Sequence, residues 1–176
     1  MPNYSLEQIC VYGIDRFIKN KIPIIDNTRV LFSPSQVIAG EGVFEAVIVA
    51  NPFEATPLPG GFTACKFGVY FTYRTDPQSS EKYQLALFGI AQDFIKELIL
   101  SVTAKDFAWE WYDPVVDDGV TVRKASMNAT LIDAGYESIR VGTQAETGEG
   151  TPSAYTNVAM VTLELAMNYL PLRLGV

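Results

Sequence analysis

Histidine is absent from this chain of 176 residues, and other residues that carry chemistry are scarce. General acid and base catalysis near neutral pH most often uses histidine, so the commonest catalytic group is missing. The two cysteines, Cys10 and Cys65, are too few for a disulfide framework in a chain of this length, and their apolar neighbours predict buried free thiols. These absences favour an assembly or binding role over catalysis, and we expect no catalytic residue, metal or cofactor.

Long apolar runs and positive charge are also scarce. No stretch approaches the roughly 18 consecutive apolar residues of a membrane span, so we expect no membrane partner. Thirteen basic against twenty acidic side chains give a net charge of −7, which argues against a surface that reads nucleic acid, because neutralising phosphates needs a basic patch. An acidic wall suits a channel through which DNA slides without binding, although plain solubility is the commoner meaning of such a charge.

Apolar residues, in contrast, are abundant and make up 48% of the sequence. This share and the chain length predict one packed domain over residues 1–176 that needs no support from disulfides or metals. The first residues lack the basic and apolar segments of a secretion signal, so we expect synthesis in the cytoplasm.

The first predicted helix begins after Ser5. Ser5 and Gln8 have the spacing of a capping box, in which each side chain satisfies an unpaired backbone amide at the helix start. Apolar residues then recur at steps of three and four as far as Ile18, and the basic cluster at residues 19–21 ahead of Pro23 suits a helix end. We expect the apolar stripe of this helix to pack against the core.

Two short strands and a loop should follow this helix. Residues 30–32 and 44–50 have the composition of strands. Residues 51–61 contain three prolines and a Gly-Gly pair, so they are predicted to form a loop. Phe53 and Leu58 in this loop either fold back on the core or reach a partner.

A long strand at residues 62–74 leads through a turn at residues 75–78 into an amphipathic helix at residues 80–101. One face of the strand is continuously apolar: Cys65, Phe67, Val69, Phe71 and Tyr73. The helix also has an apolar face, and we expect it to pack on the sheet. Charged residues on its other side, among them Asp93 and Glu97, are predicted to be solvated.

A hairpin is predicted after the long helix. Trp109, Trp111 and Tyr112 lie in its first strand, with both tryptophans on one side, and residues 117–119 form a turn before a second strand at residues 120–122. Exposed aromatic rings in this strand would suit a small-ligand site. No basic groove accompanies them, so packing in the core or in a subunit interface is the favoured interpretation.

Strands are predicted at residues 128–132 and 138–141, with a break at residues 133–135, and a long alternating strand at residues 155–169. The last strand far exceeds the mean of about 5–6 residues, so we expect it to bend or to extend past its own sheet toward another chain. Residues 142–153 are predicted to be a mobile acidic loop that contacts a neighbouring subunit. The candidate interface residues are Thr143, Gln144, Glu146, Glu149, Thr151 and Tyr155.

Carboxylates are the remaining candidates for chemistry. A metal site at Asp113, Asp117 and Asp118 is one hypothesis, and the simpler one is that these residues belong to a hairpin turn. An enzyme that uses Asp93, Glu97 and Asp117 is the least favoured hypothesis, because no recognisable catalytic setting surrounds them.

These patterns predict an α+β fold in which a mixed or antiparallel sheet is packed by the N-terminal helix and one long central helix. The order is a helix, two or more strands, the strand ending Tyr70-Phe71-Thr72-Tyr73-Arg74-Thr75-Asp76, a long helix and two closing strands. This order resembles that of the tail terminator, or tail completion, proteins of long-tailed bacteriophages, a family of α/β sandwiches. The likeness covers most of the chain. Residues 102–135 depart from it, and we expect them to be an insertion.

The resemblance implies a structural virion protein that forms a six-fold ring at the head-proximal end of the tail tube, ends tube growth and joins the tail to the head. Its implied partners are further copies of itself, the tail tube protein and the head-closure or connector proteins, with genomic DNA passing unread through the lumen. Another head-closure or tail-tube protein is the nearest alternative, and a small-ligand binding module is a further one. In a ring, the loop at residues 142–153 and the final strand would complete a neighbour.

Overall fold

The structure is a computed structural model that describes residues 5–31, 42–76, 78–104, 108–113, 116, 118, 120–125, 129–143 and 154–168. Two long helices and seven strands make up this part of the chain. In chain order they are α1 (Leu6–Lys21), β1 (Asn27–Leu31), β2 (Glu45–Pro57), β3 (Thr63–Thr75), α2 (Ser80–Val102), β4 (Trp109–Tyr112), β5 (Val122–Ala125), β6 (Ala129–Thr143) and β7 (Ala154–Met167), with a short 3₁₀ helix at Pro59–Gly61 between β2 and β3.

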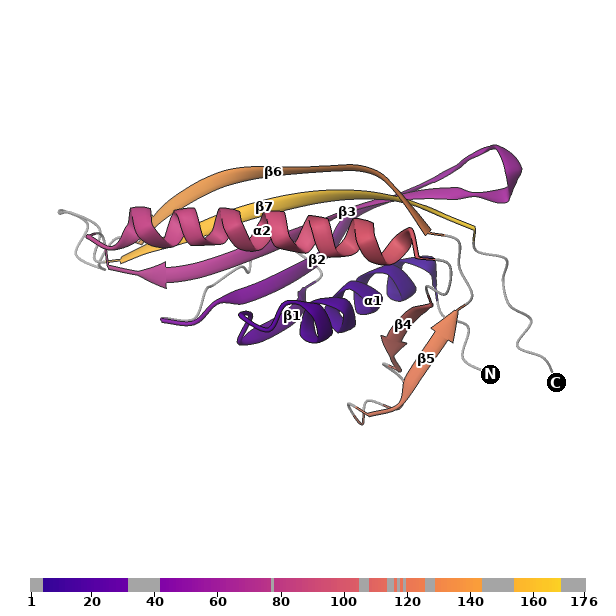
Figure 1. Cartoon of the computed structure of the whole chain (residues 1–176), viewed down its shortest axis with the longest axis horizontal. Helices are drawn as coiled ribbons and strands as arrows, with labels where there is room; N and C mark the ends of the chain where they lie inside the picture. The colour runs from indigo at the N-terminus through magenta and orange to yellow at the C-terminus, as the bar shows by residue number, and fades with distance from the viewer. Residues whose placement is uncertain are drawn as a thin grey trace.

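Five of the strands form one sheet in the order β1-β2-β3-β7-β6 (Figure 1). β1 and β2 are parallel, and the other neighbours are antiparallel, so the sheet is mixed. Both helices pack on the same face of it: α2 on β3, β7 and β6, and α1 on β1 and β2. The predicted α+β fold, a sheet packed by the N-terminal and central helices, is confirmed.

The capping box predicted at the start of α1 is present. The hydroxyl of Ser5 accepts a hydrogen bond of 3.2 Å from the amide of Gln8, and Oε1 of Gln8 accepts one of 3.0 Å from the amide of Ser5. Further along the helix, Asp15 connects α1 to β1: its Oδ1 accepts a 2.5 Å hydrogen bond from the hydroxyl of Thr28, and its Oδ2 pairs with Lys19. The helix is therefore fixed to the sheet by a buried carboxylate as well as by its apolar stripe.

Alternation along β3 and β7 places one face of each strand in the core. The inward residues are each no more than 8% exposed: Cys65, Phe67, Val69, Phe71 and Tyr73 of β3, and Ala159, Val161, Leu163, Leu165 and Met167 of β7. Together with the apolar faces of α1 and α2 they form a single cluster. A shift of either strand by one residue would expose its whole inward row, so the register is strongly set. The face predicted for β3 and the alternation predicted for β7 are confirmed.

The start of α2 is held by polar side chains. Oδ1 of Asp76 accepts hydrogen bonds from the amides of Gln78 and Ser79, at 2.9 and 3.1 Å. These bonds, the one from Ser79 above all, lower the pKa of the Asp76 carboxyl. One residue later, the buried hydroxyl of Ser80 donates a 2.7 Å hydrogen bond to Asn157 of β7, which ties the helix start to the sheet. Neither helix in the described part of the chain is long and apolar enough to cross a membrane.

β1 begins earlier than the predicted strand at residues 30–32. Its parallel pairing with β2 starts at Asn27, opposite Glu45. The carboxylate of Glu45 also accepts a hydrogen bond from the side chain of Asn27 and pairs with Arg29, at 3.2 and 2.9 Å. These polar contacts extend the strand where the apolar pattern alone does not.

The loop predicted at residues 51–61 is wrong over residues 51–57, because β2 continues to Pro57, and the connection to β3 is confined to the residues after it. The register between β2 and β3 shifts between Val49 and Glu54, and pairing then resumes to the strand end. Pro52 lies within the shift and Pro57 at the end of the strand. A proline is tolerated at such positions because no ladder hydrogen bond requires its missing N–H group.

The break predicted at residues 133–135 is also wrong, because β6 is one continuous strand. Its pairing with β7 skips Ile132 and resumes at Asp133. A bulge of one extra residue bends a strand without ending it.

Of the two alternatives predicted for the last strand, a bend or an extension past its own sheet, the extension is wrong for β7 as far as Met167. It lies between β3 and β6 and pairs with both from Tyr155 to Met167. Its 14 residues match the 13 residues of β3 and the 15 residues of β6. The length of β7 is thus explained within one chain.

β4 and β5 form a separate two-stranded hairpin, and β4 packs on α1 (Figure 1). β5 begins at Val122, two residues after the predicted start. The turn is longer than the one predicted at residues 117–119. The carboxylate of Asp118 accepts hydrogen bonds from the amides of Val120 and Thr121, at 2.9 and 2.7 Å, which keeps these two residues in the turn. The hairpin lies within residues 102–135, whose status as an insertion stays a prediction.

Both cysteines are buried free thiols, as predicted. Sγ of Cys10 lies 3.0 Å from Sδ of Met167, where α1 meets β7. Burial is the largest cause that raises the pKa of the Cys10 thiol well above its usual value. This thiol is therefore neutral and unreactive near pH 7.

Candidate functional site

A cleft lies where α1, the end of α2 and the β4–β5 hairpin meet. Its volume is about 460 Å³, within the range of about 300–1,000 Å³ typical of small-molecule sites. Its apolar lining comes from all three elements: Gly13, Phe17, Ala104, Ala108 and Trp109. The cleft is thus built by segments that are far apart in the sequence.

Trp109 separates this cleft from the core. Trp109 is only 2% exposed, and its Nε1 donates a 2.8 Å hydrogen bond to the backbone carbonyl of Ile9 in α1. Gly13 of α1 makes room for the ring, because a Cβ atom at this position would lie 2.1 Å from the same Nε1. The glycine therefore allows the indole to lie directly against the helix.

Three cations and one carboxylate line the cleft: Arg16, Lys21, Lys124 and Glu110. Oε2 of Glu110 accepts hydrogen bonds from Nε and Nη2 of Arg16, at 3.2 and 3.0 Å. Its Oε1 pairs with Nζ of Lys124 at 2.7 Å. The bond with Lys124, and then that with Arg16, lowers the pKa of the Glu110 carboxyl although partial burial opposes this.

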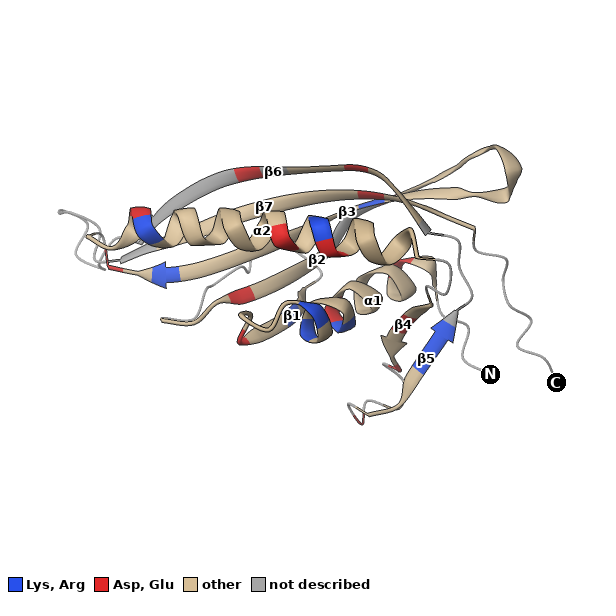
Figure 2. Cartoon of the chain, viewed as in Figure 1, with Lys and Arg blue, Asp and Glu red and all other residues tan. Residues whose placement is uncertain are grey.

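The cleft has a surplus of positive charge. Lys21 forms no ion pair within the part of the chain that the structure describes, and the other two cations share the single carboxylate of Glu110. Figure 2 shows Lys and Arg on α1 and on β5 of the hairpin beside it. A chain with a net charge of −7 therefore has a local positive region here.

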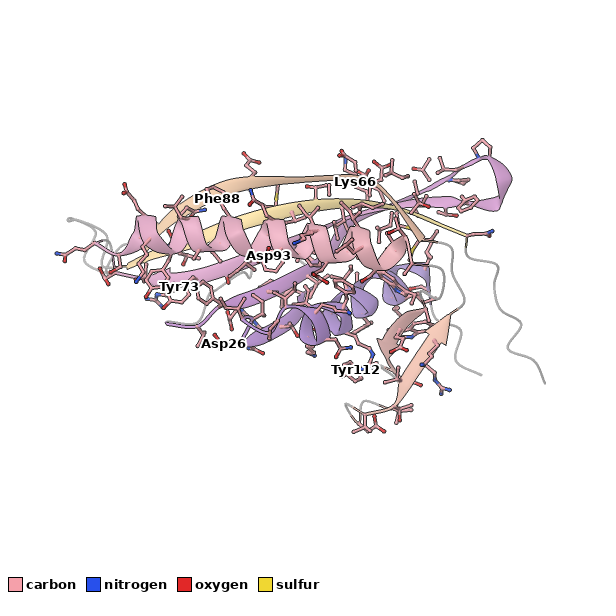
Figure 3. The ribbon with its side chains drawn as sticks, viewed as in Figure 1. Asp26, Lys66, Tyr73, Phe88, Asp93 and Tyr112 are labelled. Atoms are coloured by element: carbon pink, nitrogen blue, oxygen red, sulfur yellow. The ribbon has the colours of Figure 1, made fainter. Side chains whose placement is uncertain are left out.

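The three aromatic residues considered for a ligand do not form one stacking surface. Trp109 lines the cleft, whereas Trp111 is 4% exposed and belongs to the core. Tyr112 (Figure 3) lies under two cations of α1: the guanidinium carbon of Arg16 is 4.8 Å, and Nζ of Lys19 is 5.4 Å, from its ring centroid. Both tryptophans belong to the core cluster, which is the first of the two favoured alternatives, packing in the core or in a subunit interface.

Of the six interface candidates, the structure places two. Thr143 ends β6 and pairs with Ala154, and Tyr155 pairs with Gly142, so both lie at the same end of the sheet. The predicted loop at residues 142–153 therefore starts no earlier than residue 144. The other four candidates lie outside the described residues: Gln144, Glu146, Glu149 and Thr151.

Two of the carboxylates considered for a metal site have partners within the hairpin. Oδ2 of Asp113 pairs with Nε of Arg123 at 2.8 Å, and Asp118 caps the turn through the amide and hydroxyl of Thr121. Asp117 lies outside the described residues. Among the residues that the structure does describe, no three His, Cys, Asp or Glu side chains are grouped to hold a metal ion.

The carboxylates considered for an enzyme lie apart from the cleft. Asp93 is exposed on α2 (Figure 3), and Glu97 follows one helical turn later. Neither lines the cleft. The described residues thus bring neither of these two carboxylates to it.

The charged part of the cleft does not follow from the sequence pattern. Arg16 and Glu110 are 94 positions apart, and periodicity shows which face of an element is buried but not which distant faces meet. One local signal was available. Gly13 interrupts the apolar stripe of α1, and a glycine inside a helix costs about 0.5–1 kcal/mol relative to alanine, so its presence indicates a close approach by another element.

Comparison with known proteins adds no family to these observations. No protein-family model matches the chain, and no curated protein matches it either. The resemblance to tail terminators in the order of elements therefore stays a prediction.

Proposed function

We propose that this protein is a structural protein of a long-tailed phage, a tail terminator that forms a ring at the head-proximal end of the tail tube, ends tube growth and joins tail to head. The order of helices and strands along the chain supports the proposal, because it is the order on which the resemblance rests. The observation that carries it is the presence of two unlike edges in the sheet that no described strand covers.

β6 forms the first of these edges. It has 15 residues and pairs with β7 on one side, while no described strand pairs with its other side. An edge strand of this length presents a row of backbone N–H and C=O groups that can pair with another chain. β6 also carries an exposed apolar side chain, because Ile132 at the bulge is 49% exposed. This edge is therefore suited to contact a second copy.

The opposite edge is made by other strands. β1 pairs with β2 only between Glu45 and Val49, which leaves residues 54–57 of β2 without a described neighbour on that side. Contact between one edge of a copy and the unlike edge of the next is head-to-tail, and such contacts generate a ring when the rotation closes. The six-fold order of the ring follows from the resemblance alone.

The proposed partners follow from the terminator role. They are the tail tube protein, the head-closure or connector proteins and further copies of this chain, within the virion. Genomic DNA passes through the lumen without being read, in keeping with a net charge of −7 that offers little to bind phosphates. Another head-closure or tail-tube protein is the nearest alternative, because both would use the same sheet edges.

Negative-stain electron microscopy of the purified protein, alone and mixed with tail tubes, tests this function. We expect rings, or caps at the ends of tubes. Protein that polymerises into tubes would favour the tail-tube alternative, and rings that bind only connectors would favour head closure. Monomers that leave the tubes bare would contradict an assembly role.

Deletion of residues 143–151 tests the proposed contact of this segment with a neighbour. Ring formation or tube capping should weaken, while the thermal unfolding midpoint stays close to that of the wild type, because the pairing of β6 with β7 up to Gly142 is kept. A deletion variant that assembles normally would show that this segment is not part of the interface.

The cleft favours a second candidate function, a small-ligand binding module. Of the aromatic residues considered for such a site, Trp109 lines the cleft and the other two do not. The volume and the charged rim of the cleft are the observations that support this candidate function.

A further inference from the structure

The floor of the cleft is apolar and fixed. It is formed by Gly13, Phe17 and Trp109, and Phe17 packs edge-on against Phe94 with ring centroids 6.1 Å apart. The polar atom of the indole, Nε1, is already bonded to Ile9. Because the floor is built from apolar groups and its one polar side-chain atom already has a partner, it favours an apolar group over a polar one.

The rim of the cleft retains hydrogen-bond donors. Arg16 uses Nε and Nη2 on Glu110, and its Nη1 makes no hydrogen bond within the described part of the chain. Lys124 gives one contact to the same carboxylate, and an ammonium group has three N–H donors. With Lys21 added, three cations can turn donors toward a ligand while a single carboxylate opposes them.

Two helix ends weaken this positive field without reversing it. α1 ends at Lys21 and α2 at Val102, both beside the cleft. A helix C-terminus is equivalent to about half a negative charge, so the two ends offset about one of the two surplus positive charges. One carbonyl of the last turn of α2, that of Ile99, is also occupied by the amide and hydroxyl of Thr103. The cleft therefore still attracts anions.

We propose that this cleft binds a small aromatic anion, a flat ring that carries a carboxylate or a phosphate group. The ring lies on the floor, and the anionic group lies at the rim among Arg16, Lys21 and Lys124. A volume of about 460 Å³ has room for a molecule of this size. The inference rests on the second candidate function and is independent of ring formation.

Tryptophan fluorescence of the full-length protein provides the test, because both tryptophans of the chain lie in β4. The probes are phenyl phosphate, benzoate and the uncharged benzyl alcohol. We expect a saturable response to one or both anions that weakens as salt screens the rim, and no response to benzyl alcohol at the same concentrations. The tighter of the two anions identifies the charged group.

Charge variants separate the rim from general apolar binding. Lys21→Gln and Lys124→Gln should each weaken binding of the anion about threefold to tenfold, because each removes one charged donor. Lys82→Gln is the matched control. It removes the same charge from the first turn of α2, far from the cleft at the other helix end, and should leave the affinity unchanged.

A size variant tests the position of the site independently of charge. Ala104 is exposed at the mouth of the cleft, so Ala104→Phe should block the site and abolish the response without lowering the thermal unfolding midpoint. Equal responses to benzyl alcohol and benzoate, no response to any probe, or unchanged binding by both lysine variants would overturn the proposal. None of these results bears on whether the protein forms rings or caps tubes in electron microscopy. Failure of the ligand proposal is therefore distinguishable from failure of the assembly role.

Discussion

The indole of Trp109 donates its hydrogen bond of 2.8 Å to the carbonyl of Ile9, which is one turn before Gly13 in α1. The bond gives a buried donor a partner, and a donor left unpaired in the core costs about 1–3 kcal/mol. The same geometry leaves no room for a side chain at Gly13. The hydrogen bond and the glycine therefore depend on each other, and together they fix β4 on α1.

Gly13→Ala should destabilise the protein by at least about 1 kcal/mol, because the added methyl group must displace a well-packed ring. The higher helix propensity of alanine, worth about 0.5–1 kcal/mol, does not compensate for this. The free energy of unfolding in urea is the measurement.

Gly89→Ala is the matched control for this change. Gly89 is in α2, and a Cβ atom there would meet nothing within 4 Å. This variant should gain about 0.5–1 kcal/mol from helix propensity. If both variants were stabilised equally, the close contact between Trp109 and α1 would be wrong.

Glu110→Gln should destabilise the protein near pH 7 but not in acid. Hydrogen bonds from Lys124 and then Arg16 lower the pKa of Glu110 in the folded protein. A carboxyl with a lowered pKa contributes stability above its unfolded pKa of about 4.3, and this contribution is lost as the pH falls through the folded value. Thermal unfolding midpoints of the wild type and the variant should therefore converge below about pH 4.3.

A carboxylate on β6 offers the control for this pH dependence. Glu137 is exposed and forms no ion pair in the described part of the chain. Glu137→Gln should keep the wild-type midpoint near pH 7. A gap between Glu110→Gln and the wild type that stayed constant down to the lowest pH would show that the variant acts through packing rather than charge.

Ser80→Ala and Asn157→Ala should each cost about 1–3 kcal/mol, because each leaves a buried polar group of the other residue without its partner. Asn157 is fully buried and accepts a 2.7 Å hydrogen bond from Ser80. In urea unfolding, the double variant should lose less than the sum of the two single losses. Strict additivity would show that the pair does not act as a unit.

Ile132→Lys should prevent ring formation or tube capping without changing the thermal unfolding midpoint of the monomer. Ile132 is exposed on the edge strand β6, so a charge is tolerated in the monomer but opposes pairing with another chain. Leu85→Lys, on α2 at a residue that is 68% exposed, is the control and should assemble normally. Electron microscopy that found both variants in rings would exclude this edge as the contact.

Elements with one buried face could be predicted from the sequence alone. The capping box at Ser5 and the apolar rows of β3 and β7 depend on local residues and on a fixed period, so α1, α2 and the central strands were predicted correctly. The errors at residues 51–61 and 133–135 share a cause. Proline and glycine indicated strand ends, whereas pairing with a neighbouring strand continued past a register shift.

The candidate site could be predicted only in part. Burial of Trp109 and Trp111 followed from their placement on one side of a short strand. The contact between Arg16 and Glu110 could not be predicted, because it depends on how the hairpin docks on α1. No local sequence pattern indicates that docking. The expected overhang of β7 failed for a similar reason, since the length of one strand does not reveal the lengths of its partners.

β7 is synthesised after every other described strand, yet it occupies a place inside the sheet, between β3 and β6. While the ribosome still holds this segment, β3 has only β2 beside it, and β6 has no partner in the sheet. Both therefore present open edges to other nascent chains. Closing the sheet also requires contacts between residues far apart in the sequence, which slows folding. A chain that stops before Ala154 is consequently left with unjoined pieces of a sheet rather than a smaller one.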